Sequence, residues 1–263
     1  MADGKLEDKL AGKIVDAEEL SKEFKEHSVA EFFKKNKQML GLYGKVRTLT
    51  TVIHEYVTNS LDACEEANIL PDIDVKIDEL GSEYYEITIK DNGPGLTEET
   101  VGKALGKLLA GTKFHRMMQS RGQQGIGSSG CTMLSQMTTG KPIKVITGTG
   151  DGKTISLQLS IDPKRNEPKI ANKKDLTKNF RGLAVQAKFK GVLYRDSEQG
   201  ALEYLRRTAI ANPHAQISFR DPAGQKITFK RTLNKVPERP KVVKPHPKGV
   251  TVDEIVTLAK YTD

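Results

Sequence analysis

The chain contains no tryptophan, and aromatic residues make up only 6% of its 263 positions. Proteins that bind single-stranded nucleic acid by stacking bases on aromatic rings need more of them, so this class is disfavoured. No apolar run approaches the ~18 residues that a membrane span requires. The first segment, MADGKLEDKLAGK, lacks the apolar centre of a secretory signal. We therefore expect a cytoplasmic protein with no membrane partner.

Cysteine is also scarce, since Cys64 and Cys131 are the only two and stand far apart without metal-ligand spacing. We expect two reduced, buried thiols. The net charge is +8 at pH 7, which is compatible with polyanion binding but equally with a generic basic surface. The basic residues are spread along the chain and form no arginine-rich arm. Charge alone therefore permits DNA binding without indicating it.

Periodicity predicts an alternation of helices and strands. Helices are expected over residues 17–40, 49–67, 125–137 and 197–211, with another starting at residue 252. Strands are expected at 73–77, 85–89, 142–148, 153–161, 183–190, 216–219 and 226–229. This order predicts an α+β two-layer sandwich, in which a mixed, mostly antiparallel sheet carries helices on one face. We divide the chain into an N-terminal helical strap (1–45), a main domain (46–234) and a Pro/Lys-rich linker that enters a helix (235–263).

Three polar residues share one face of the helix predicted at 49–67. Glu55, Asn59 and Asp62 stand at i, i+4 and i+7. A carboxylate one turn from a carboxamide can hold a water against a magnesium-bound phosphate. Glu55 would accept the proton of that water, and Asn59 would bind Mg²⁺ through its amide oxygen. The alternative interpretation is a solvated polar stripe.

The second motif, DNGPG at residues 91–95, follows a predicted strand. The Asp91 carboxylate can accept a hydrogen bond from the exocyclic amine of adenine. Gly93 and Gly95 allow the backbone to approach a ligand closely. An ordinary Asn-Gly turn is the alternative, although this motif is longer than such a turn needs.

The third motif is rich in glycine and opens a predicted helix, where free N–H groups and the helix dipole favour phosphate. Thr112 and Lys113 precede it, in a loop without periodicity, and would add a hydroxyl and a cation. The candidate phosphate-binding residues of this motif are Gly122, Gln123, Gln124, Gly125, Ile126, Gly127, Ser128 and Ser129. A dinucleotide fingerprint also fits the glycines, but no strand precedes them, so we reject it.

The three motifs in this order resemble the ATPase superfamily of gyrase, Hsp90, histidine kinases and MutL. The closer resemblance is to the B subunits of archaeal-type DNA topoisomerase VI. It covers most of residues 20–250. The segments that carry it are 28–42 (SVAEFFKKNKQMLGL), 59–72 (NSLDACEEANILPD), 106–127 (GKLLAGTKFHRMMQSRGQQGIG), 137–142 (MTTGKP) and 244–250 (KPHPKGV).

The resemblance implies a left-handed ATP-binding fold with a flexible lid at about 106–124. It implies the same roles for Glu55, Asn59 and Asp91, with ATP and Mg²⁺ as cofactors. Phosphates would be held by Thr112, Lys113 and the loop at 122–129. ATP would close two copies into a homodimer with the strap reaching across. In a full-length enzyme, associated with the nucleoid, that closure would gate passage of double-stranded DNA through a duplex cut by the A subunit.

Three departures from the family pattern stand out. The superfamily often has a Gly-Thr pair near adenine, where this chain has Gly182 and Leu183. Thr58 occupies a place where the topoisomerase motif usually has an acid, but it points off the Glu55 face. The sequence stops at Asp263, within the expected helix-two-turn-helix region and before a transducer domain. Because that domain supplies a lysine to the γ-phosphate, we expect hydrolysis by this chain to be slow or absent.

Three functions therefore compete. The first is the ATPase module of a type II topoisomerase. The second is a nucleotide-switched dimerisation module without effective hydrolysis, in which differential affinity for two lid states drives assembly. The third is a basic DNA-binding protein with a relic nucleotide site, which predicts steeply salt-dependent DNA binding that ATP does not affect. Because the motifs of the nucleotide site are intact, we rank the third function last.

Overall fold

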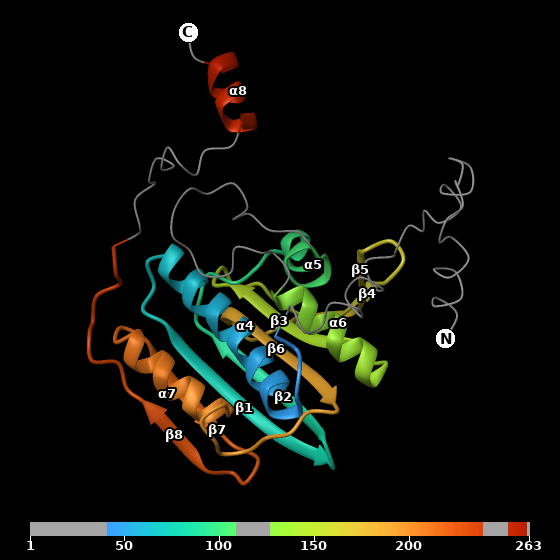
Figure 1. Ribbon diagram of the computed structural model, residues 1–263, viewed down its shortest axis with the longest axis vertical. Helices are drawn as coiled ribbons and strands as arrows, with labels where there is room; N and C mark the ends of the chain where they lie inside the picture. Colours follow the sequence, from blue (N-terminus) through green and yellow to red (C-terminus); the bar gives the residue numbers. More distant parts are fainter. Residues whose placement is uncertain (1–40, 109–126, 239–251, 262–263) are drawn as a thin grey trace, which may run out of the picture.

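A computed structural model describes residues 41–108, 127–238 and 252–261. One eight-stranded mixed sheet, in the order β5-β4-β3-β6-β2-β1-β7-β8, forms one layer. The described helices other than α8 cover one face of that sheet, as Figure 1 shows. In chain order the elements are α4 (Lys45–Glu66), β1 (Asp72–Gly81), β2 (Tyr84–Asp91), α5 (Glu98–Gly106), α6 (Gly127–Thr139), β3 (Ile143–Thr149), β4 (Thr154–Asp162), β5 (Glu167–Leu176), β6 (Arg181–Lys190), α7 (Ala201–Ala211), β7 (Gln216–Arg220), β8 (Lys226–Phe229) and α8 (Val252–Tyr261).

The predicted fold class is confirmed. β1 pairs with β7 in parallel, and the other strand pairs are antiparallel. The helix expected at 49–67 begins four residues earlier, at Lys45, and ends at Glu66. One strand was missed in the sequence: β5 has no buried residue and therefore no apolar alternation to reveal it. The expected helix at 17–40 lies outside the described residues, and so does the expected lid from residue 109 on, whereas Gly106 of that lid ends α5. The proposed domain boundaries stay a prediction.

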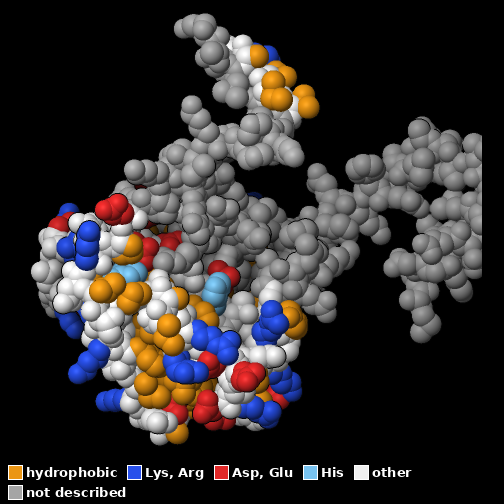
Figure 2. Space-filling model, turned by 60° about the vertical axis from the view of Figure 1, so that its left-hand side comes forward, with side chains coloured by type: hydrophobic (Ala, Val, Ile, Leu, Met, Phe, Trp, Pro, Cys, Tyr) orange, Lys and Arg blue, Asp and Glu red, His pale blue; other side chains and the backbone are white. Residues whose placement is uncertain are grey.

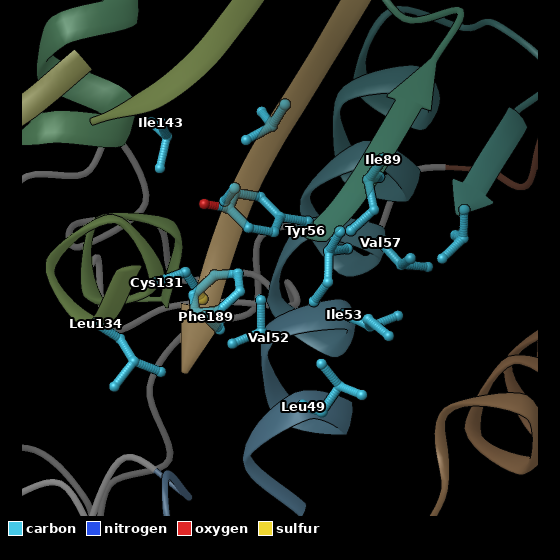
Figure 3. Packing of buried hydrophobic residues seen from close by; sticks show 14 of the residues in the cluster. Leu49, Val52, Ile53, Tyr56, Val57, Ile89, Cys131, Leu134, Ile143 and Phe189 are labelled. Carbon is cyan, nitrogen blue, oxygen red and sulfur yellow. The ribbon is translucent and has the colours of Figure 1, made fainter. Parts of the chain in front are cut away.

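The core lies between the sheet and the helices because α4 and the strands each present one apolar side. Val52, Ile53 and Val57 recur on α4 at helical spacing and are fully buried. Figure 3 shows them facing Ile89 of β2 and Phe189 of β6. From the other side, α6 contributes Cys131 and Leu134 to the same cluster. Both cysteines are buried and free, as expected.

The short helix α5 begins with a side-chain cap and an acidic first turn. The Thr97 hydroxyl accepts a hydrogen bond from the backbone N–H of Thr100, and Glu98 and Glu99 occupy the first turn. Acids at this end of a helix interact favourably with its dipole. α5 packs on β4 and β5, where Pro168 lies so close that a side chain at Gly106 would collide with it.

The two edge strands are β5 and β8. β5 carries Pro168 and a cluster of lysines, and its pairing with β4 shifts register between Ser156 and Gln158. β8 has only four residues. None of the helices in the described ranges combines the length and apolar character that crossing a membrane requires.

Candidate functional site

Asp91 is the last residue of β2, and its carboxylate is almost completely buried. Oδ1 accepts hydrogen bonds from the backbone N–H groups of Gly93 (2.9 Å) and Leu183 (3.0 Å). Oδ2 accepts one from the Ser60 hydroxyl at 2.8 Å. One carboxylate is thus held from α4, from β6 and from its own loop, which fixes its orientation.

Burial raises the pKa of the Asp91 carboxyl above its ordinary value, while the hydrogen bonds from Ser60, Gly93 and Leu183 oppose the rise. These are donors that favour the ionised form, and none is a cation. An ionised Asp91 retains lone pairs beyond those that the three donors use. It can therefore accept a further hydrogen bond from a ligand, as the interpretation of this residue as an adenine acceptor requires.

Asn92 fastens the motif to the connection between α4 and β1. Its Oδ1 accepts from the backbone N–H of Asp72 (2.9 Å), and its Nδ2 donates to the carbonyl of Leu70 (3.0 Å). The Cys64 thiol also donates to Oδ1 at 3.5 Å. Burial, followed by the nearby Asp91 charge, raises the pKa of Cys64 to about 12, so the thiol keeps its proton. Through these three hydrogen bonds, Asn92 fixes the position of the loop at 91–95.

Close backbone contacts require glycine at one position of the motif and at one position of β6 beside it. Gly95 has φ +73°, and a Cβ there would lie 2.2 Å from the carbonyl oxygen of Gly148 in β3. Gly182 has φ +126°, and its Cβ would lie 2.0 Å from the carbonyl of Asp91. The buried Thr147 hydroxyl accepts from the Leu96 N–H (2.7 Å) and donates to the Leu96 carbonyl (2.9 Å). The loop therefore lies directly against β3 and β6.

Glu55 projects from α4 toward the start of α6. A Cβ built on Gly127 would lie only 1.9 Å from Glu55 Oε2, so the carboxylate touches this glycine. The side chain is 27% exposed, and His54 Nδ1 lies 3.6 Å from Oε1. The structure thus joins the first motif to the last residue of the GQQGIG motif. Gly127 is needed because any side chain there would displace Glu55.

Asn59 lies one turn after Glu55, half-buried, and no hydrogen bond from a described residue occupies its amide. Asp62, the third member of the predicted face, is buried. No group of three or more His, Cys, Asp or Glu side chains able to hold a metal occurs in the described ranges. A magnesium ion usually keeps waters and takes one or two protein ligands with substrate phosphates, so a single amide oxygen fits such a site.

Of the predicted phosphate-binding residues, the structure describes the last three. Gly127 begins α6, Ser128 donates from its hydroxyl to the Ala104 carbonyl (3.0 Å), and Ser129 is buried. Ser128 Oγ therefore also ties α6 to α5. The others lie outside the described residues: Thr112, Lys113, Gly122, Gln123, Gln124, Gly125 and Ile126.

The last described residue before that gap is Leu108, and it is clasped by Asn166 from the β4–β5 turn. Asn166 Oδ1 accepts from the Leu108 N–H (3.0 Å), and Nδ2 donates to the Leu108 carbonyl (2.9 Å). Asn166 has φ +55°, which asparagine tolerates better than most residues. This clasp holds the beginning of the segment, about 106–124, that is predicted to form the lid.

Sequence reasoning missed Ser60, Leu183, Thr147 and Asn166. No site was assigned to Leu183 because it lacks the hydroxyl that the family often places there. The structure shows that its backbone N–H, which any residue but proline would supply, contacts Asp91. Ser60 directly follows Asn59, and a serine inside an otherwise apolar helix face was the available signal. Thr147 and Asn166 act across 51 and 58 residues of sequence, which no local pattern reveals.

Comparison with known protein families indicates the class of this chain. A family model described as histidine kinase-, DNA gyrase B-, and HSP90-like ATPase matches residues 44–163. The chain therefore contains an ATPase domain of this class. Among solved structures, the MutL ATPase domain of Aquifex aeolicus, complexed with ADP, aligns with a TM-score of 0.46 and 16% identity, covering 70% of this chain and 64% of that one.

Curated relatives define the family within that class. The B subunit of type 2 DNA topoisomerase 6 from Pyrococcus horikoshii is 52% identical over 94% of this chain. The corresponding proteins of Thermococcus kodakarensis and Methanothermobacter thermautotrophicus are 51% and 50% identical over 95% and 91% of it. The chain belongs to the family of type 2 DNA topoisomerase 6 B subunits. It spans less than half the length of these relatives, with 44–46% of each covered.

Proposed function

We propose that this chain is the ATP-binding and ATP-hydrolysing module of a type II DNA topoisomerase B subunit. One observation carries the proposal. The buried Asp91 carboxylate, held by three donors, shares α4 as a support with Glu55, whose carboxylate touches the N-terminus of α6. A base-reading acceptor and a candidate general base are thus built on one helix, next to a helix end that suits phosphate.

In the proposed mechanism, Asp91 accepts a hydrogen bond from the adenine amine, and the tight Gly93–Gly95 backbone lies beside the base. The phosphates extend toward the N-terminus of α6, where free N–H groups and the helix dipole stabilise negative charge. Glu55 takes the proton of the attacking water. Asn59 would hold Mg²⁺, which when bound neutralises phosphate charge. We propose Thr112, Lys113 and residues 122–129 as further phosphate ligands.

The partners follow from the family and stay proposals. ATP would drive two copies into a dimer with the strap (1–45) crossing between them, and the main domain (46–234) would hold the nucleotide. In a full-length context the protein would act with a topoisomerase A subunit on double-stranded DNA, in the nucleoid. ATP-driven closure would gate strand passage and relax supercoils.

The test is single-turnover hydrolysis of ATP by wild type, Glu55→Gln and a matched control on the same helix, Glu66→Gln. Loss of a general base costs roughly 10²–10⁴ in rate, so we expect that loss in Glu55→Gln and no loss in Glu66→Gln. Affinity for a non-hydrolysable ATP analogue should be retained by both variants. Hydrolysis that survives Glu55→Gln would refute the assigned mechanism.

Sedimentation of wild type with and without the analogue tests dimerisation. A rise in mass combined with no measurable turnover would instead support the nucleotide-switched dimerisation module. Failure of the wild type to bind the analogue would contradict both proposals.

A further inference from the structure

The face of the sheet opposite the helices is free of described secondary structure, and most of its strand positions carry polar or charged side chains. Strand residues alternate between faces, so the burial of Val75, Ile87 and Val185 toward the helices places their neighbours on this open face. Figure 1 shows α4, α5, α6 and α7 on the other side. By contrast, the side of the molecule brought forward in Figure 2 has Lys and Arg flanking a patch of apolar side chains.

Across the five strands β3, β6, β2, β1 and β7, cations outnumber carboxylates on the open face. The carboxylates at alternating positions of β1 and β2 are Asp74, Asp78 and Glu86, and Asp72, at the start of β1, is paired to Arg231. The cations, drawn from five strands, are Lys76, Lys90, Lys144, Lys188, Lys190 and Arg220. The face is therefore positive, although the sequence shows no cluster of basic residues.

Two of these carboxylates are already neutralised by neighbours on the sheet. Asp78 pairs with Lys76 (2.6 Å) and with Arg220 (3.8 Å). Glu86 pairs with Lys188 at 3.3 Å and also accepts a hydrogen bond from the Gln186 amide at 2.8 Å. The positive charge that remains is thus not cancelled locally.

Two cations near the middle of this face are available to a ligand, Lys144 on β3 and Lys90 on β2. Both are exposed, and neither has an acidic partner within the described part of the chain. Lys90 instead stands 5.6 Å from the ring centroid of Phe180, which leaves its charge intact. Each can meet a phosphate without first breaking an ion pair.

The donors form a row at right angles to the strands. Strand pairing places side by side Lys144, Gln186, Thr88, Lys76 and Arg220, on β3, β6, β2, β1 and β7. Four inter-strand steps of ~4.8 Å make this row about 19 Å wide. B-form DNA has grooves about 12 Å and 6 Å across, so a surface of this width reaches phosphates on both strands. Every member of the row can donate a hydrogen bond.

We propose that the open face of the sheet binds the phosphate backbone of duplex DNA, with Lys144 and Lys90 as principal contacts. That the ligand is DNA rests on the proposed function. The location of the binding surface rests on the charges and the strand register described above. Contacts of this kind position a duplex without reading its sequence. The binding would therefore be sensitive to salt and indifferent to sequence.

The test compares binding of a 30-bp duplex, over a salt series, by wild type, by Lys90→Gln/Lys144→Gln and by Arg206→Gln/Arg207→Gln. The last variant loses the same charge on α7, on the helix-covered side. Each phosphate contact contributes roughly 0.9 to the slope of log K against log salt. We expect the slope of the sheet variant to fall by about 2, with affinity at low salt about tenfold weaker or worse. The α7 variant should match wild type.

Equal loss in both variants, or no loss in either, would overturn the assignment. The assignment would also be overturned if a heparin fragment bound as tightly as the duplex and its binding were weakened equally in the sheet variant. The surface would then be a general polyanion-binding surface. The same preparations are titrated with the ATP analogue. Intact analogue binding alongside failed DNA binding would reject this surface and leave the nucleotide site standing, whereas failed analogue binding would count against the proposed function instead.

Discussion

Replacing Asp91 with asparagine should separate nucleotide binding from stability. An asparagine Oδ1 can accept from the N–H groups of Gly93 and Leu183, as the carboxylate does at 2.9 and 3.0 Å. Its Nδ2 can donate to the Ser60 hydroxyl, which lies 2.8 Å from Oδ2 and can act as acceptor. All three internal bonds therefore survive, and the loop keeps its place.

The ligand, in contrast, would meet an amide donor where it needs an acceptor. A hydrogen bond to a charged group contributes about 1.5–3 kcal/mol. Its loss corresponds to roughly 10–150-fold weaker binding. Calorimetric titration of Mg²⁺ and a non-hydrolysable ATP analogue into both proteins measures this change. Unchanged affinity in a folded Asp91→Asn variant would refute the placement of adenine at this carboxylate.

The pH dependence of stability supplies an independent check. Burial raises the pKa of Asp91 in the folded protein, so the native state holds this proton more tightly than the unfolded chain does. This contribution to stability is therefore present at low pH and is lost as pH rises from the ordinary carboxyl range through the raised pKa. Asparagine has no such loss. In urea unfolding, the free energy of unfolding of Asp91→Asn relative to wild type should therefore rise across that pH window and stay higher at neutral pH. A difference that does not vary with pH, or that varies in the opposite sense, would contradict the buried-carboxylate account.

Two further predictions concern the phosphate side. Gly127→Ala should leave the midpoint of thermal unfolding nearly unchanged, because the flexible Glu55 carboxylate can turn away from the added methyl group. The rate of single-turnover hydrolysis should nevertheless fall by roughly 10²-fold or more, because Glu55 is the proposed general base. A rate equal to that of wild type would show that Glu55 is not held there. Asn166→Gly keeps the positive φ but removes both bonds to Leu108, each worth about 0.5–1.5 kcal/mol, so affinity for the ATP analogue should fall about tenfold while affinity for adenosine is unchanged. Equal weakening of both ligands would mean that the clasp supports the whole site and not its phosphate end.

The fold was largely predictable from sequence where local patterns carry the information. The α4 face and the strands β1, β2, β7 and β8 follow from periodicity, and the structure confirms them. β5 could not be found in this way, because an exposed edge strand needs no apolar alternation.

The candidate site divides in the same manner. The candidate residues on one helix face or in one loop, such as Glu55, Asn59 and Asp91, can be selected from the sequence because their spacing is local. The supports of the site were not, because they come from other strands. Leu183 acts through its main chain, which leaves no trace in residue type. Thr147 is an ordinary buried threonine until the fold brings Leu96 to it.

The edge strands bear on how two copies of this chain can associate. A new strand adds to a sheet only along a regular, unprotected row of backbone groups. β5 interrupts such a row with Pro168, a register shift and several lysines, and β8 is only four residues long. Growth of the sheet from one copy into the next is therefore disfavoured at both ends. A nucleotide-dependent dimer would have to be built from helices, loops or the strap, so its closing and opening need not break any strand pairing inside the domain.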